Sequence, residues 1–316
     1  MFRVLRKIVL SSLMLLVAAG SAWAAYPERP ITLIVPFGAG GGTDIPARLL
    51  SGMMEKKLGK SIVVQNISGA AGTLGAFQTA SAKADGYTLG YMPIGTMCLQ
   101  PHLMKLPYTV DDFDFIGMAV MQPVVIMSSK SAPWKNFEEF KDIVSKNPNK
   151  YVVGITAKGN MTHVPMLAML KHYNLKMRVI PYRNSTEIFK DMMAGRTHLF
   201  ADAPAALSSY DIFGLMQFAP ERAGNLTDIP TAKECGLDME FAHWMGIVAP
   251  KGMPDEAKAT LEKVMKEVVE SEDFKKEAIR IKTAAHWMSG KEFRERYYEE
   301  LAQYKKILEE NGLIAK

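Results

Sequence analysis

Two stretches of the chain share one order of features, and both contain residue types that bind anions. Residues 33–44 read LIVPFGAGGGTD, and residues 151–165 read YVVGITAKGNMTHVP. In each stretch, an apolar run typical of a buried strand leads through glycine to a threonine, Thr43 or Thr162, that we expect to cap a helix. Free N–H groups at the start of a helix bind anions. Two such starts facing one another would therefore bind a small carboxylate.

The glycine cluster of the first stretch has two other interpretations. It could bind a nucleotide, but Thr43 stands at the last position of G-x-G-x-x-G, and the cluster is not followed directly by the Gly-Lys-Ser or Gly-Lys-Thr of a P-loop. It could also be a plain tight turn without a ligand. The second stretch, with its own glycine and threonine, favours anion binding.

The expected ligand contacts lie in these two loops or at the end of a strand. The threonine hydroxyls could turn toward a ligand oxygen, and an asparagine amide offers both a donor and an acceptor. Asp202 could recognise an amino or hydroxyl group of the ligand, or it could cap the next helix. The expected contacts are Phe37, Gly41, Gly42, Thr43, Asn66, Gly159, Asn160, Met161, Thr162 and Asp202.

Three neighbouring residues are expected to be structural. Asp44 stabilises its own helix start and would repel an anion unless it turned away. His163 lies in the first turn of the second helix, where a buried, hydrogen-bonded histidine is the simpler interpretation. Trp244 is assigned to core packing.

The sequence gives little support for catalysis or metal binding. It contains no G-x-S-x-G, no H-E-x-x-H, no Cys/His cluster with metal-ligand spacing and no paired carboxylates near a glycine loop, so we expect no catalytic residue, metal or cofactor. Cys98 and His102 come closest to a nucleophile–base pair, but no Asn or Asp can be tied to them. Cys98 and Cys235 could form a disulfide in an exported protein; two separate buried thiols are expected instead.

The first 24 residues have the pattern of a secretory signal peptide. Arg3, Arg6 and Lys7 precede an apolar run, and Ala22-Trp23-Ala24 supplies small residues for cleavage after Ala24. The apolar run is shorter than the ~20 residues that span a membrane, although a retained anchor is the alternative. We therefore expect a secreted, soluble protein.

The net charge excludes one class of function. Residues 1–24 hold three of the 38 Lys and Arg residues and none of the 33 Asp and Glu residues, so the mature chain is close to neutral. The chain has no basic stripe with interleaved aromatic residues, so nucleic-acid binding is not expected.

Short apolar runs alternate with amphipathic helical stretches, which predicts an α/β protein with parallel sheets. We expect helices over residues 45–58, 137–146 and 164–172 and two long polar helices over 254–271 and 291–311. The chain is expected to build lobe 1, cross to lobe 2 and return, with two hinge crossings. Lobe 1 would comprise residues 25–123 and 245–316, and lobe 2 residues 124–244. Ligands of open α/β sheets bind beyond the carboxyl ends of the strands, so both glycine loops would lie in the cleft between the lobes.

Seven segments, in order along nearly the whole mature chain, resemble the Bug-type periplasmic solute-binding receptors of tripartite tricarboxylate transporters. They read VPFGAGGGTD, VVQNISGAAGTLGA, ADGYTLGYM, KLPYTVDDF, PYRNSTEIFKDMMAGR, TDIPTAKECGL and HWMGIVAPKGMP. The resemblance implies a type II periplasmic-binding-protein fold and capture of a small organic acid for a membrane permease. It also implies that residues 37–44 and 158–163 hold a carboxylate, partly through ordered water.

The chain departs from the family in lobe 2. Family members commonly have small or hydroxyl residues where this chain has Met161, and often an aspartate where it has Ala201; Asp202 is the acidic residue nearby.

The main hypothesis is therefore a periplasmic receptor, expected to be a monomer, that closes two lobes around a small carboxylate and delivers it to permease subunits. The alternatives are an exported hydrolase or lyase of the same architecture and a sensor subunit that delivers the acid to a signalling receptor. The sequence does not select the acid.

Overall fold

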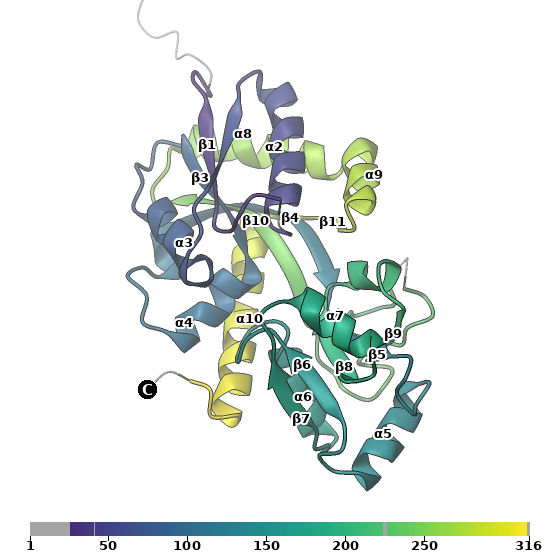
Figure 1. The fold of residues 1–316 in the computed structure, drawn as a ribbon. Coiled ribbons are helices and arrows are strands. Elements are labelled where there is room, and N and C mark those ends of the chain that lie inside the picture. Colours follow the sequence, from purple (N-terminus) through teal and green to yellow (C-terminus); the bar gives the residue numbers. More distant parts are fainter. Residues whose placement is uncertain (1–25, 41, 224–225, 315–316) are drawn as a thin grey trace, which may run out of the picture.

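The structure, a computed structural model, describes residues 26–40, 42–223 and 226–314. The expected signal peptide and Gly41 lie outside these residues. Within them, no helix is long and apolar enough to cross a bilayer. Two sheets, each with helices packed on it, form the two parts of the molecule (Figure 1).

The first sheet has six strands in the order β11-β4-β10-β3-β1-β2. Strands β1, β2 and β3 run parallel, whereas β10 is antiparallel to both β3 and β4, and β11 is antiparallel to β4. The strand bounds are Ile31–Val35 (β1), Ile62–Asn66 (β2), Thr88–Pro93 (β3), Phe113–Pro123 (β4), Ala242–Pro250 (β10) and Ala285–Ser289 (β11).

The second sheet has five strands in the order β7-β6-β8-β5-β9. Strand β6 is parallel to β7 and β8, and β5 is antiparallel to β8 and β9. The expectation of parallel sheets is therefore wrong in part, because each sheet also contains strands that run against its parallel set. The bounds are Val125–Ser129 (β5), Val152–Ile155 (β6), Arg178–Pro181 (β7), Leu199–Asp202 (β8) and Ile212–Gln217 (β9).

Two chain crossings connect the sheets. Strand β4 ends at Pro123 and β5 begins at Val125, so the chain changes sheets within a single extended segment. It returns after β9 and enters β10, which pairs with β4 along its whole length, His243 lying opposite Gln122. The two crossings therefore lie side by side. The residues assigned above to each lobe stay a prediction.

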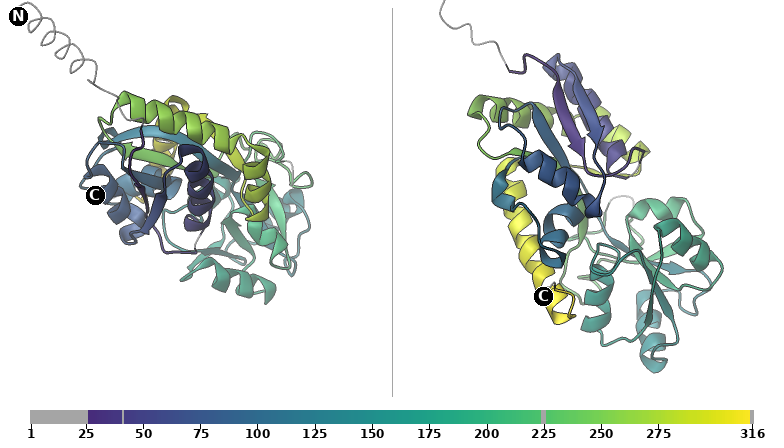
Figure 2. Two further views of the ribbon diagram at one scale, coloured as in Figure 1. Left: turned by 90° about the horizontal axis from the view of Figure 1, so that it is seen from above. Right: turned by 60° about the vertical axis from the view of Figure 1, so that its left-hand side comes forward.

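Helices cover both sheets (Figures 1 and 2). In the first part of the molecule they are α2 (Asp44–Leu58), α3 (Thr73–Ala80), α4 (Gln100–Leu103), α8 (Asp255–Val269), α9 (Glu272–Arg280) and α10 (Gly290–Glu310), with a short 3₁₀ turn at Ala70–Gly72 and a π-turn at Gly95–Leu99. In the second part they are α5 (Phe137–Lys146), α6 (Val164–His172) and α7 (Ser185–Met193), and a 3₁₀ turn lies at Pro204–Ser208.

Local signals explain where several helices begin and end. The Asn136 side chain accepts the N–H of Glu139 at the start of α5, which satisfies one of the unpaired donors of a helix N-terminus. Helix α2 ends at Gly59, whose left-handed φ of 66° lets its N–H bond to the Glu55 carbonyl. Helix α9 and strand β11 were not expected, although Ser271 caps α9 by accepting the N–H of Phe274.

Helix α10 packs against both parts of the molecule (Figure 2). Its buried side chains Phe293 and Tyr304 belong to the same hydrophobic cluster as Val153 of β6 and Met169 of α6. One core therefore continues from the first sheet to the second along this helix.

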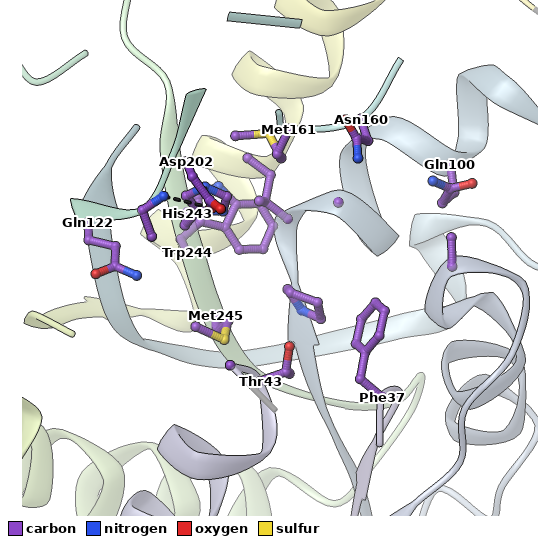
Figure 3. Close-up of a pocket in the computed structure, with 16 residues that line it drawn as sticks. Phe37, Thr43, Gln100, Gln122, Asn160, Met161, Asp202, His243, Trp244 and Met245 are labelled. Carbon is purple, nitrogen blue, oxygen red and sulfur yellow. Dashed lines mark hydrogen bonds and ion pairs between the residues drawn. The ribbon is translucent and has the colours of Figure 1, made fainter. Parts of the chain in front are cut away.

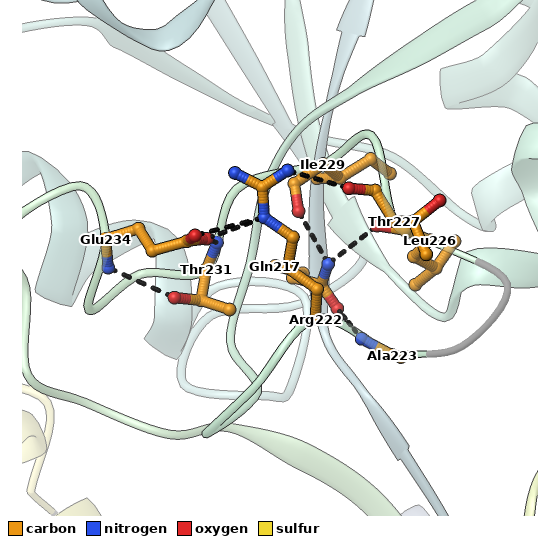
Figure 4. A network of polar contacts seen from close by, with 8 residues as sticks. All are labelled: Gln217, Arg222, Ala223, Leu226, Thr227, Ile229, Thr231 and Glu234. Atoms are coloured by element: carbon orange, nitrogen blue, oxygen red, sulfur yellow. Dashed lines mark hydrogen bonds and ion pairs between the residues drawn. The ribbon is translucent and has the colours of Figure 1, made fainter.

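A polar network shapes the segment between β9 and β10 (Figure 4). The buried Gln217 amide donates to the carbonyls of Leu226 and Ile229, at 2.9 and 2.7 Å, and accepts the N–H of Ala223. These bonds replace the regular backbone pairing that a long connection lacks. In the same segment, the Arg222 side chain donates to the carboxylate of Glu234.

Candidate functional site

A pocket of about 380 Å³ lies where the two sheets and the two crossings meet (Figure 3). The ends of β1 and β3, the start of α2, the loop between β6 and α6, the end of β8 and the crossing strands β4 and β10 all contribute to it. It is lined by Phe37, Gly42, Thr43, Ala71, Pro93, Ile94, Gly95, Gln100, Gln122, Asn160, Met161, Asp202, Ala203, His243, Trp244 and Met245.

Asp44 holds the first loop in shape. It is almost completely buried, and its carboxylate accepts the N–H of Gly40 (2.8 Å), Nε of Arg48 (2.8 Å) and the amide of Asn66 (2.8 Å). Burial alone would raise the pKa of Asp44, but the hydrogen bonds from Arg48, Gly40 and Asn66 outweigh it and lower the pKa. The carboxylate is thus turned into the loop, as expected for a structural residue.

Asn66 also belongs to this supporting layer. Its amide nitrogen donates to the Phe37 carbonyl at 2.8 Å as well as to Asp44, and its oxygen accepts from Arg48 at 3.0 Å. These bonds use the amide inside the loop, and Asn66 does not line the pocket. The structure therefore places it behind the ligand loop rather than in contact with the cavity.

The second loop is built in the same way. Gly40 and Gly159 both have a φ of +75°, and each donates its N–H to the side chain four residues later, Asp44 at 2.8 Å and His163 at 2.9 Å. In both loops a threonine precedes that side chain, and a proline follows two residues after it. The two loops therefore share a local geometry on unrelated strands, with histidine replacing aspartate in the second.

The threonines are not side-chain caps. Thr43 occupies the N-cap position of α2, but its backbone is helical and its hydroxyl makes no capping bond. Helix α6 begins at Val164 with His163 as its N-cap, so the expected cap at Thr162 is wrong. The Thr162 hydroxyl instead bonds to Asn160 at 2.8 Å and accepts the N–H of Thr156 at 3.0 Å, which closes the loop on itself.

Both loops carry free backbone donors on residues that line the pocket. Among the described residues, the N–H groups of Gly42, Thr43, Asn160 and Met161 have no hydrogen-bond acceptor. They stand at the starts of α2 and α6, where the helix dipoles are positive. The two helix starts, more than a hundred residues apart in sequence, thus share one cavity.

The pocket contains six of the ten expected contacts: Phe37, Gly42, Thr43, Asn160, Met161 and Asp202. Asn66, Gly159 and Thr162 support the loops from behind, and Gly41 lies outside the described residues. A ligand contact from any of these residues stays a prediction.

The remaining polar wall has no local signal in the sequence. Gln100 comes from α4, and Gln122 and His243 come from the paired crossing strands. Asp202 does not cap the following 3₁₀ turn, whose N-cap is Ala203; its carboxylate accepts the Ala203 N–H at 2.8 Å and lies 4.0 Å from Nε2 of His243. Only the pairing of distant strands brings these side chains together.

Trp244 lines the pocket with an apolar ring, and a hydrogen bond to helix α10 holds the ring in place. Its indole N–H donates to the carboxylate of Glu300 at 3.0 Å, and Arg296 and Tyr304 bond to the same carboxylate. Burial raises the pKa of Glu300, and the attraction of Arg296 opposes that rise. Trp244 is therefore both the core residue expected from the sequence and a lining residue of the pocket.

The charges of the pocket are few. Among the described residues that line it, none is lysine or arginine, and Asp202 is the single carboxylate. No group of three or more His, Cys, Asp or Glu in the described parts of the chain could hold a metal ion. Cys98 and Cys235 are both free; Cys98 is buried as expected, whereas Cys235 is only partly buried. Burial raises the pKa of both thiols.

Two α/β lobes joined by paired crossing strands, with matched helix starts in one cleft, define the class of two-lobed periplasmic solute-binding proteins. The chain belongs to the tripartite tricarboxylate transporter family receptors, whose pattern it matches over residues 46–313.

Related proteins agree with this assignment. A UPF0065 protein of Bordetella pertussis is 32% identical over 83% of this chain and 82% of its own length. A Rhodopseudomonas palustris protein solved with adipate is 25% identical, with a TM-score of 0.80 over 92% of this chain and 99% of that one. MatC of the same organism, solved with bound malate, is 26% identical, with a TM-score of 0.75 over 90% of this chain and 100% of that one.

Proposed function

We propose that this receptor binds one carboxylate of a small organic acid between the starts of α2 and α6 and delivers the acid to the permease subunits of a tripartite transporter. The observation that carries the proposal is the shared cavity of the two loops, where the N–H groups of Gly42, Thr43, Asn160 and Met161 have no acceptor among the described residues. Adipate and malate, held by two similar receptors, are of the same chemical class.

The energetics favour backbone donors for this task. A carboxylate that leaves water loses hydration, and each lost hydrogen bond must be replaced inside the site. Rigid N–H groups at helix starts replace it without the reorganisation that flexible side chains would need. The bonds of Asp44 and His163 to Gly40 and Gly159 hold the loops in this form before ligand arrives.

The proposal also includes export of the protein, binding of the acid without turnover, and delivery of the acid to the permease. The protein would be cleaved after Ala24, act in the periplasm as a monomer and change its lobe arrangement when ligand binds, a population shift that a permease can read. Cleavage predicts an N-terminal residue of Ala25 in the exported protein, and no consumption of the bound acid is expected.

A thermal-shift screen over mono-, di- and tricarboxylates, amino acids and aromatic acids tests the binding site. A ligand at a hundred times its Kd should raise the free energy of unfolding by ~2.7 kcal/mol. Gly42→Leu should abolish this gain because Gly42 lines the pocket. It should leave the unliganded protein folded because a Cβ added there meets no atom within 4 Å.

Gly52→Leu is the matched control. It places the same side chain within α2, where a Cβ also meets no atom within 4 Å, but Gly52 does not line the pocket. Full ligand stabilisation of Gly42→Leu would contradict the assignment of the first loop. Consumption of the acid by the purified wild-type protein would contradict a receptor function and favour an enzyme.

A further inference from the structure

The pocket has a second polar corner, formed by Asp202 at the end of β8 and His243 of β10 (Figure 3). The carboxylate Oδ1 and imidazole Nε2 are 4.0 Å apart, too far for a direct hydrogen bond. Nε2 of His243 is buried and has no hydrogen-bond partner among the described residues. A buried polar atom without a partner is costly, so this corner is incomplete without a further group.

The spacing of the two atoms indicates which group fits. For a donor atom placed about 2.8 Å from both Oδ1 and Nε2, the angle Oδ1–donor–Nε2 is about 90°. Two N–H bonds of one nitrogen can point at acceptors separated by this angle. A hydroxyl has one hydrogen and cannot donate to both, and a carboxylate has none, whereas an ammonium group has three. Burial lowers the pKa of His243, against the opposing effect of Asp202, and so favours the neutral imidazole. With its proton on Nδ1, a neutral imidazole accepts at Nε2.

The charge of the corner also favours an ammonium group. Asp202 is the single carboxylate on the described lining, and no lysine or arginine there would balance it. A dicarboxylate would bring two negative charges into a cavity of about 380 Å³ that already holds the carboxylate of Asp202. A cationic end neutralises Asp202 instead.

The surroundings favour a cation over water. Trp244, Met161 and Met245 line the cavity together with the pair, and the indole of Trp244 is completely buried. These three side chains offer water little hydrogen bonding, since the Trp244 N–H is already bound to Glu300, whereas an aromatic ring attracts a nearby ammonium group. In Figure 3 the pair lies on the opposite side of the cavity from Phe37 and Thr43.

We propose that the ligand is a zwitterion with a carboxylate at one end and an ammonium group at the other. The carboxylate binds the N–H groups of the two helix starts, and the ammonium donates to Asp202 and His243. This rests on the proposed function for the carboxylate end, and it separates this receptor from one that is selective for dicarboxylates.

Calorimetric titration at pH 7.5 with three matched ligand pairs tests the proposal. The pairs are succinate with 3-aminopropionate, glutarate with 4-aminobutyrate, and adipate with 5-aminopentanoate; each pair differs by an ammonium in place of a carboxylate. In the pair of the best-fitting length, the amino acid should bind the wild-type protein at least tenfold more tightly.

Asp202→Asn keeps the size of the side chain and removes its charge. It should weaken binding of the amino acid at least tenfold and strengthen binding of the matched dicarboxylate. The control Asp142→Asn, at an exposed position on α5, should change neither affinity. His243→Phe keeps a ring and removes the acceptor. It should weaken binding of the amino acid severalfold more than binding of the matched dicarboxylate, which provides a second test if Asp202→Asn does not fold.

The outcomes separate the two proposals. The zwitterion proposal would be overturned if dicarboxylates bound as tightly as the matched amino acids, or if Asp202→Asn did not change the selectivity. Neither result would contradict the proposed carboxylate receptor. Failure of every ligand in both sets to bind would count against the proposed function itself.

Discussion

His163 and Asp44 hold the two ligand loops by the same kind of bond, but they respond differently to pH. Each accepts the N–H of a glycine four residues earlier. The hydrogen bonds of Asp44 favour its charged form and lower its pKa. His163 accepts through Nδ1, so this bond needs an unprotonated nitrogen, and burial with the nearby Lys158 lowers the pKa of His163 to about 4.

A pH titration of stability tests the role of His163. The unfolded chain takes up the proton below pH 6.5 and the folded chain only near pH 4, so stability is lost as the pH falls through this window, by up to about 3 kcal/mol at 1.36 kcal/mol per unit. His163→Asn keeps an acceptor for Gly159 and does not titrate. Chemical denaturation between pH 7 and 4 should show a smaller loss for this variant, and parallel curves would refute the assignment.

At the scale of elements, α10 supports the pocket through β10. Glu300 lies on the buried face of α10 and bonds to Trp244 of β10, while Arg296, one turn earlier, compensates its charge. The pocket wall thus depends on a helix that does not line it. A buried pair with one partner removed leaves an uncompensated charge in the core.

Glu300→Ala should therefore lower the free energy of unfolding by about 3 kcal/mol, since it leaves the Trp244 N–H without its partner and Arg296 with Glu240 alone. Urea denaturation measures this loss. Glu300→Gln should cost less because its amide oxygen still accepts from Trp244. Glu299→Ala, at the exposed neighbouring position, should stay within about 0.5 kcal/mol of the wild type; a similar loss in both alanine variants would argue against the buried network.

At the scale of the whole molecule, the two sheets are connected on one side and separated by a pocket on the other. The crossing strands β4 and β10 pair with each other, and α10 carries the core from the first sheet to α6. The pocket lies between the loops that open from β1 and β6. Motion of one part relative to the other would thus bend at the crossings and change the opening of the pocket.

Small-angle X-ray scattering tests this motion. A ligand that raises the melting temperature of the wild-type protein should lower its radius of gyration, because the lobes close over the bound molecule. The same ligand should leave the scattering of Gly42→Leu unchanged. A scattering curve that does not respond to a stabilising ligand would mean that binding proceeds without closure.

The sequence by itself determined the local features of this protein. The expected helices over 137–146 and 164–172 coincide with α5 and α6, and the strand–glycine–helix pattern located both pocket loops, because glycine conformation and hydrophobic periodicity act between residues close in the chain. The expected threonine caps did not form. The family resemblance extended this to the receptor fold, which the comparisons confirm.

The tertiary structure alone decided the direction of β10, the position of Asn66 behind the loop and the polar wall of Gln100, Gln122 and His243. These features depend on contacts between segments far apart in the chain, and no local pattern encodes which strand pairs with which. His243 lies near Asp202 because His243 pairs with Gln122 near the end of β4, and Asp202 pairs with Val125 at the start of β5, just beyond it. Long-range pairing thus assembled the corner that we propose selects the ligand.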